Sequence, residues 1–245
     1  MTGNLNVLMM TVLSLFAGAC VFAAEPEFSV TPGDNSLQVK VKENVENRAM
    51  TDAVFGKIGD SNTAKIWKSG LYIKSPPPGL NNVTLCGTIR VSGQKGGVRV
   101  ISCGAGNLIT SGYRLSAMAD DGKFFLNLLV VGLPDAALPE GKNARYCIIT
   151  SKEKTFKCGE WIFFAVVFNR AGKAEIFVNG ELVLGSSIQT FEKDDLAPGT
   201  PTVIGNTEGA GGVSLELANM EVYYSLLSSV DLDKLKGKWL DILKK

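Results

Sequence analysis

The stretch Ala174–Ser187, AEIFVNGELVLGSS, places two apolar runs on either side of Asn179-Gly180. Asn-Gly between strand-like runs is the strongest short-range signal for a β-hairpin, because both central residues of a type I′ turn need a positive φ angle. A two-residue loop sets Phe177 opposite Leu182, and both faces of the hairpin are then mostly apolar. We therefore expect this hairpin to be covered on both sides or to line an apolar groove, and its main role to be structural.

Short strand-like runs separated by turn residues continue on both sides of this hairpin. Gly, Asp-Gly and a Pro-Pro-Pro-Gly segment separate the runs. Repeated short strands with such turns predict an antiparallel sandwich rather than βαβ units. The expected strands are Leu37–Val41, Leu71–Lys74, Val83–Val91, Val98–Ser102, Tyr113–Ala117, Lys123–Val131, Arg145–Thr150, Trp161–Asn169, Lys173–Val178, Glu181–Gly185, Thr202–Ile204 and Leu215–Tyr224.

Two further segments complete the expected architecture. The run that begins at Trp161, WIFFAVVF, is apolar on both faces and predicts a central strand. Trp161 could stack on a sugar, but a place in the core is favoured. The tail has apolar residues at helical spacing, so we expect an amphipathic helix over residues 230–243 that packs on the sandwich. The sequence thus predicts an all-β fold with a short C-terminal helix.

The charge balance and the absence of histidine limit the function. The 245 residues contain 25 Lys+Arg and 24 Asp+Glu, so the net charge of +1 gives no reason to expect nucleic acid as a partner. With no His, Ser-His-Asp and Cys-His catalysis is impossible within this chain. Glycoside hydrolysis needs only two carboxylates, and it stays open as an alternative. We expect a protein that is not an enzyme.

The first 24 residues read as a signal peptide. They carry no charged side chain, and the run from Val7 to Ala19 is apolar but short for a membrane span, which needs about 20 residues. Cleavage after Ala23 or Ala24 would send the chain to a secreted or periplasmic location, with no membrane span in the mature chain. A membrane anchor is the alternative. Cys20 follows small residues and is a candidate for lipidation.

Four cysteines follow the signal segment, and an even number in an oxidising compartment suggests disulfides. Three connectivities are possible, and the simplest joins sequence neighbours, Cys86 to Cys103 and Cys147 to Cys158. Buried free thiols are the alternative. No pair has CxxC spacing and no His is present, which argues against a zinc site.

Several segments together resemble the laminin-G-like, or concanavalin A-like, jelly roll. The segment Gly159–Asn169 resembles a strand of that family that opens with Gly-Glu-Trp. The segment Phe177–Gly180 resembles the hairpin "Tyr-Val-Asn-Gly" that follows it. Thr202–Gly205 and Met220–Ser228 resemble the next strand and the closing strand. The resemblance covers roughly residues 64–243, with residues 25–63 left as a linker, an extra edge strand or a partner-binding arm.

The resemblance implies two stacked antiparallel sheets that bind sugars, glycoproteins or other proteins, in some members with calcium. The acidic pair that precedes the closing strand in many members is replaced here by Ala218 and Asn219. After Ile204-Gly205, one branch of the family has a calcium-binding loop. Asn206 and Glu208 could supply two oxygen ligands there, although calcium takes six to eight. No cofactor is expected apart from this possible calcium ion.

The sequence therefore favours a secreted, non-catalytic, lectin-like module that binds carbohydrate or glycoprotein. Sugar sites combine an aromatic platform with amide or carboxylate hydrogen bonds. The candidate ligand-binding residues are Tyr113, Tyr146, Asn206 and Glu208. An adhesion module that binds an envelope or matrix protein is the first alternative, and an atypical glycoside hydrolase is the second.

Overall fold

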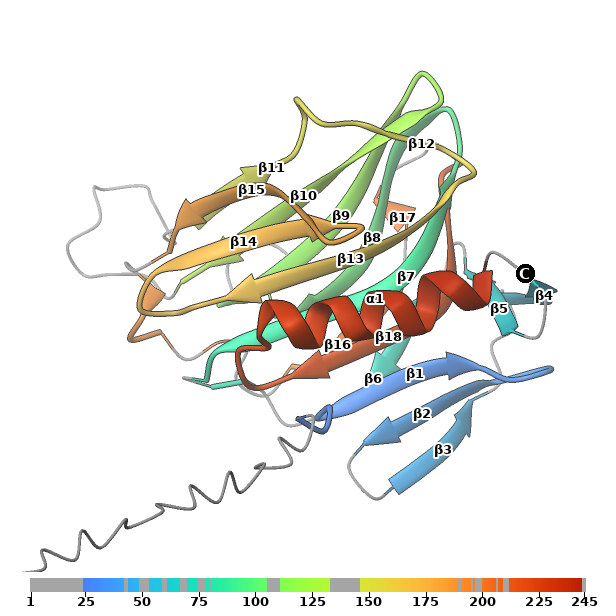
Figure 1. The fold of residues 1–245 in the computed structure, drawn as a ribbon, viewed down its shortest axis with the longest axis horizontal. Coiled ribbons are helices and arrows are strands. Elements are labelled where there is room, and N and C mark those ends of the chain that lie inside the picture. Colours follow the sequence, from blue (N-terminus) through green and yellow to red (C-terminus); the bar gives the residue numbers. More distant parts are fainter. Residues whose placement is uncertain are drawn as a thin grey trace, which may run out of the picture.

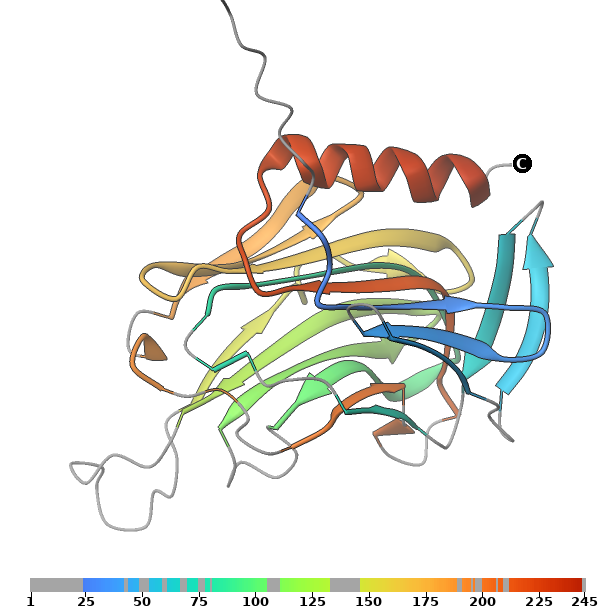
Figure 2. The same ribbon diagram turned by 90° about the horizontal axis from the view of Figure 1, so that it is seen from below.

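The computed structural model of the protein is a sandwich of two antiparallel sheets with one helix on the outside (Figure 1). In the view of Figure 2 the sheets lie as two layers, and helix α1 (Ser229–Leu243) lies outside the large sheet. This arrangement confirms the predicted fold class. The structure describes residues 24–41, 44–48, 53–58, 61–66, 70–74, 78–79, 81–104, 111–132, 146–188, 191–194, 196, 200–205, 207–208 and 212–243.

The large sheet has ten strands among the described residues. Its order is β15-β14-β13-β7-β18-β1-β2-β3, and β5 also pairs with β18 and with β4. The strands are β1 (Phe28–Pro32), β2 (Leu37–Val41), β3 (Asn44–Arg48), β4 (Ala53–Ile58), β5 (Ser61–Ile66), β7 (Val83–Ser92), β13 (Trp161–Phe168), β14 (Lys173–Val178), β15 (Glu181–Ser187) and β18 (Ser214–Tyr223).

The small sheet has eight strands in the same part of the chain. Its order is β11-β10-β9-β8-β16-β6, with β12 on β10 and β17 on β8. The strands are β6 (Gly70–Ile73), β8 (Lys95–Cys103), β9 (Gly112–Asp120), β10 (Lys123–Val131), β11 (Tyr146–Thr150), β12 (Phe156–Lys157), β16 (Thr202–Gly205) and β17 (Thr207–Glu208).

The hairpin predicted at Asn179-Gly180 forms between β14 and β15. The φ angles of Asn179 and Gly180 are 53° and 87°, as a type I′ turn requires, and Phe177 pairs with Leu182. The Asn179 side-chain oxygen also accepts a hydrogen bond of 2.9 Å from the Phe163 backbone N–H, which ties the turn to β13. Ala174, Ile176 and Val178 of β14 are buried in the core, and Phe177 packs in the cluster beneath α1. The strand β15 is largely exposed, so the expected cover on both faces holds only for β14.

The core lies between the two sheets and is built by alternation. In β13, Ile162, Phe164, Val166 and Phe168 face the core, while Phe163 and Ala165 face α1. Both faces of β13 are therefore covered, which confirms the predicted central strand and explains why its sequence is apolar throughout.

The N-terminal residues add strands to the large sheet. In β1, Phe28 and Val30 are buried and pair with Val222 and Met220 of β18. Further along β18, β5 occupies the same side of that strand. The boundary expected between residues 63 and 64 therefore falls inside β5. The predicted signal peptide and Cys20 lie outside the described residues and stay predictions.

Helix α1 covers the outer face of the large sheet. Its first turn is capped by Ser228, whose hydroxyl accepts the Asp231 N–H at 3.2 Å and donates to the Asp231 carboxylate at 2.6 Å. Leu232 packs with Phe163 and Ala165 of β13 in a cluster separate from the main core. Within the described part of the chain, no helix is long and apolar enough to cross a membrane.

The predicted disulfides are wrong, because all four described cysteines are free thiols. Cys86 faces α1 and Cys103 faces the core, so the large sheet itself separates the first expected pair. Cys147 lies opposite Val130 of β10, and the Cys158 N–H bonds the carbonyl of Gly122, just before that strand. Gly122 and Val130, the residues beside Cys158 and Cys147, are eight residues apart along extended chain, which is roughly 25 Å. A disulfide needs two Cα atoms within about 7 Å of each other, so these two cysteines cannot be joined.

We expect a reducing agent to leave the melting temperature of the chain from residue 24 onward unchanged, because the fold contains no disulfide among its described cysteines. Burial raises the pKa of the Cys86 and Cys103 thiols, so both stay protonated and react slowly with iodoacetamide at pH 8. Half-buried Cys147 should be alkylated first in the native protein. Mass spectrometry with and without urea measures this order, and a melting temperature that falls on reduction would contradict it.

Candidate functional site

The face of the small sheet that points away from the core carries an ordered array of polar and aromatic side chains. Strand pairing places residues directly opposite one another on the same face, so rows can be followed across the sheet. Leu128 and Leu115 mark the core face, and their neighbours Leu129 and Arg114 therefore face outward. One row crosses all six strands of the main path through Ile148, Leu129, Arg114, Ser102, Val203 and Tyr72.

A second row lies beside the first and is more polar. It runs through Thr150, Asn127, Ser116 and Arg99. The Asn127 side-chain oxygen is buried and accepts no hydrogen bond from any described residue. A buried amide oxygen is costly to leave without a donor, so this position suits a hydroxyl group supplied by solvent or by a ligand. Arg99 and Arg114 are half-buried on this face, and Ser102 and Ser116 are almost completely buried.

The two sheets end side by side along one side of the sandwich, where β11 and β15 are edge strands. A pocket of about 600 Å³ opens between them. Ser151 fixes the turn after β11, because its hydroxyl accepts the Leu126 N–H at 2.9 Å. The Lys154 ammonium reaches across to the Leu182 carbonyl at 3.4 Å. The pocket is lined by Thr150, Ser151, Lys152, Glu153, Lys154, Val183 and Leu184.

Exposed apolar side chains concentrate along this open side. Tyr146 is 58% exposed and Ile148 is 55% exposed on β11, and Leu182 and Leu184 are exposed on β15. Tyr146, Ile148 and Thr150 alternate along one face of β11 and lead toward the pocket. The arrangement combines an aromatic ring with hydroxyl, ammonium and carboxylate groups, and no described His, Cys, Asp and Glu residues group closely enough to hold a metal ion.

Of the four predicted ligand-binding residues, Tyr146 lies at this surface. Tyr113 does not, because its side chain is completely buried between Cys103 and Val130, with its ring 5.3 Å from that of Phe168. Tyr113 is therefore a core residue, and its predicted contact with a sugar is corrected. Burial also raises the pKa of its hydroxyl well above the usual value.

The other two predicted residues belong to a different part of the sheet. Asn206 lies outside the described residues. Glu208 lies on β17, opposite Gly97 of β8, whereas Tyr146 lies at the far end of the sheet, opposite Val131. Along β9 the two ends are six residues apart, from Gly112 to Met118, which is roughly 20 Å. Tyr146 and Glu208 therefore do not form one site.

Sequence reasoning missed Arg99, Arg114, Asn127, Thr150, Lys152 and Lys154. The parity of each strand would have found Arg114, Asn127 and Thr150, because core residues alternate with outward residues along β9 to β11. In β8 the bulge between Arg99 and Ile101 breaks this alternation. The lysines follow β11 directly, and nothing local distinguishes them from an ordinary surface turn.

The fold is similar to that of solved receptor-binding domains of botulinum neurotoxins. The receptor-binding domain of the C/D mosaic serotype matches with a TM-score of 0.64 and 15% identity, over 88% of this chain and 52% of that chain. The serotype D ligand-binding domain in complex with N-acetylneuraminic acid matches with a TM-score of 0.58 and 14% identity, over 88% and 51%. The DC binding domain in complex with rat synaptotagmin II matches with a TM-score of 0.63 and 14% identity, over 87% and 52%.

At this level of identity the likeness shows the fold alone. The chain spans about half the length of the solved chains it matches. No protein-family model and no curated protein matches the sequence.

Proposed function

We propose that this protein is a non-catalytic binding module of the laminin-G-like kind, which recognises carbohydrate or glycoprotein outside the cytoplasm. The observation that carries the proposal is the pocket of about 600 Å³ at the open side of the sandwich. The exposed ring of Tyr146 and the exposed Thr150, beside half-buried Asn127, extend this pocket onto the small sheet.

The chemistry of these groups suits a sugar. Aromatic rings stack on the apolar face of a sugar, and hydroxyl, amide and guanidinium groups bond its hydroxyls. At the pocket, Lys152 and Lys154 outnumber Glu153, which favours a glycan with carboxylate or sulfate groups. One structurally similar ligand-binding domain is in complex with N-acetylneuraminic acid, and another binding domain is in complex with rat synaptotagmin II.

A protein partner is the second candidate. It is favoured by the exposed apolar side chains Tyr146, Ile148, Leu182 and Leu184, which line two neighbouring edge strands. Exposed apolar side chains on edge strands are typical of a surface that another protein covers.

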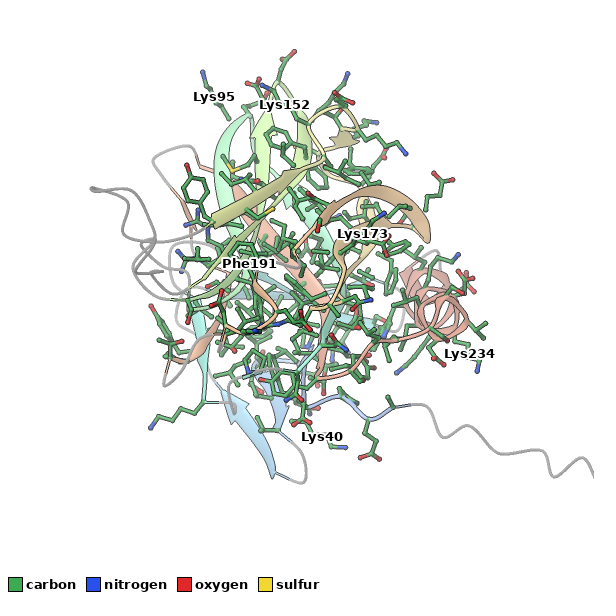
Figure 3. All side chains as sticks on the ribbon, turned by 90° about the vertical axis from the view of Figure 1, so that its left-hand side faces the viewer. Lys40, Lys95, Lys152, Lys173, Phe191 and Lys234 are labelled. Atoms are coloured by element: carbon green, nitrogen blue, oxygen red, sulfur yellow. The ribbon has the colours of Figure 1, made fainter. Side chains whose placement is uncertain are left out.

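The test is a glycan-array screen of the chain from residue 25 onward, with calcium and with EDTA. Loss of the stacking ring in Tyr146→Ala should weaken binding at least about tenfold, which corresponds to about 1.4 kcal/mol. Lys152→Ala should weaken binding of acidic glycans a few fold. Lys234→Ala is the matched control, because Figure 3 shows Lys152 and Lys234 on different sides of the molecule.

Unchanged binding by Tyr146→Ala, or binding to no glycan at all, would overturn the carbohydrate proposal. Capture of an envelope or matrix protein that is lost in Ile148→Asp would then support the second candidate. Loss of glycan binding in EDTA would indicate that binding needs calcium, with Asn206 and Glu208 as the candidate ligands.

A further inference from the structure

A second pocket lies on the opposite layer of the sandwich, between helix α1 and the outer face of the large sheet. Its volume is about 260 Å³. The pocket is bounded by β13 and β14 on one side, by the start of α1 on the other, and by the turn of the β14–β15 hairpin at one end. Its lining is Phe163, Ala165, Val167, Glu175, Phe177, Gly180, Leu227, Ser229, Leu232 and Asp233.

Most of the side chains that line this pocket are apolar, and two of them, Phe163 and Phe177, are aromatic. Phe163 and Ala165 form a buried floor, Phe177 stands half-buried beside them on β14, and Leu227 and Leu232 close the helix side. An apolar cavity of about 150 Å³ is large enough to bind benzene in another protein. The present pocket therefore has room for one ring, or a short branched chain, together with a small polar group.

One carboxylate at the rim has no partner. Glu175 lies on β14, opposite Val167 of β13 and Gly185 of β15. Gly185 leaves room for it, because a Cβ at that position would lie 3.1 Å from the Glu175 Cγ. The Glu175 carboxylate makes no hydrogen bond or ion pair with any residue that the structure describes.

The other charged residue that lines the pocket, Asp233, is already compensated. Asp233 forms an ion pair of 2.8 Å with Lys236, which lies over the hairpin turn at Gly180. The positive end of α1 is capped by Ser228 and balanced by Asp231. Counting Glu175, Asp233 and Lys236, the rim carries a net charge of −1. The uncompensated part of this charge lies at the Glu175 end.

We propose that this pocket binds a small apolar ammonium compound. The ring or branched chain lies among Phe163, Phe177 and Leu232, and the ammonium group pairs with the Glu175 carboxylate. An ammonium near Phe177 also gains from the negative face of the aromatic ring. An anion is disfavoured by Glu175, and a neutral apolar compound leaves that carboxylate without a counter-ion. This ligand differs in class and in place from the glycan proposed for the small sheet.

The probe is benzylammonium, with benzyl alcohol as a neutral compound of the same shape, titrated by calorimetry and by ligand-observed NMR against the chain from residue 25 onward. Benzylammonium should bind at least tenfold more tightly than benzyl alcohol. Glu175→Gln should weaken benzylammonium about tenfold and leave benzyl alcohol unchanged. Glu181→Gln is the matched control, because it removes the same charge from the neighbouring strand without lining the pocket.

A second variant tests the apolar part. Val167→Phe fills the pocket from β13 and should abolish binding of both probes, while circular dichroism confirms that the variant folds. Equal affinity for the two probes, an effect of Glu181→Gln as large as that of Glu175→Gln, or no binding of benzylammonium at millimolar concentration would overturn the proposal. Failure here leaves the glycan screen unaffected, because the two pockets share no lining residue.

Discussion

Phe164→Ala should lower the free energy of unfolding by about 3–5 kcal/mol. Phe164 is completely buried on the central strand β13 and lies opposite Val178 of β14 and Gly87 of β7. The Phe164 ring packs closely against Gly87 of β7, where a Cβ atom would lie only 3.1 Å from the ring. Glycine at this position therefore makes room for the ring. Removal of the ring leaves a cavity that two paired strands cannot close. Urea denaturation followed by tryptophan fluorescence measures the change.

Leu182→Ala serves as the control, because Leu182 is 49% exposed on the edge strand β15. A surface change of this kind should shift the free energy of unfolding by no more than about 0.5 kcal/mol. If Phe164→Ala cost as little as Leu182→Ala, the assignment of β13 to the centre of the core would be wrong.

The sequence predicts this part of the fold well because the signals there are local. Asn179-Gly180 needs two positive φ angles, and few other dipeptides supply them. The apolar run of β13 is read from eight consecutive residues. The expected strand Lys123–Val131 matches β10 to the residue, and the expected helix begins one residue late.

The first part of the chain shows where local signals fail. Only Leu37–Val41 was expected as a strand before residue 70, yet β1, β3, β4 and β5 also form. Phe28 and Val30 alternate with polar residues, but the reason they form a strand is the free side of β18, almost 200 residues later in the chain. A pattern of two apolar residues does not reveal such a distant partner.

The errors in the site have the same origin. Tyr113 shares a face of β9 with the core residues Leu115 and Ala117, whereas Tyr146 shares a face of β11 with the exposed residues Ile148 and Thr150. The cysteines illustrate the point again, since Cys86 and Cys103 lie on consecutive strands of different sheets, where Cys86 faces α1 and Cys103 faces the core. Side-chain parity depends on register, and a bulge such as that between Arg99 and Ile101 changes the register without a clear sequence signal.

The two proposed sites differ in chemistry as well as position. The open side and outer face of the small sheet combine an exposed ring with polar and mostly basic groups, whereas the pocket beneath α1 is apolar with one uncompensated carboxylate. Opposite charge at the two sites means that an acidic glycan and an ammonium compound should not compete. Simultaneous titration with both ligands would separate the sites without any mutation.

Arg170→Met should lower the free energy of unfolding by about 3 kcal/mol. Arg170 lies in the turn between β13 and β14, is only 3% exposed, and its backbone N–H donates to the Asn82 side chain at 2.9 Å. Its Nη2 donates to the carbonyls of Phe191 at 2.6 Å, Glu192 at 3.2 Å and Asp194. Methionine fills a similar volume but donates no hydrogen bond, so three carbonyls around a buried site lose a charged donor, and hydrogen bonds to charged groups contribute about 1.5–3 kcal/mol.

Arg170→Lys tests how much of the stabilisation comes from the positive charge and how much from the planar guanidinium group. Lysine keeps the positive charge but offers a single ammonium group in place of a planar fork, so it should recover part of the loss and no more. The guanidinium joins the segment 191–194 to the turn between β13 and β14, because its Nη2 reaches the carbonyls of Phe191 and Asp194. Urea denaturation of the three proteins measures the order Arg, Lys, Met. Equal stability of the Arg and Met proteins would show that the segment is held by its apolar contacts, chiefly those of Phe191, rather than by Arg170.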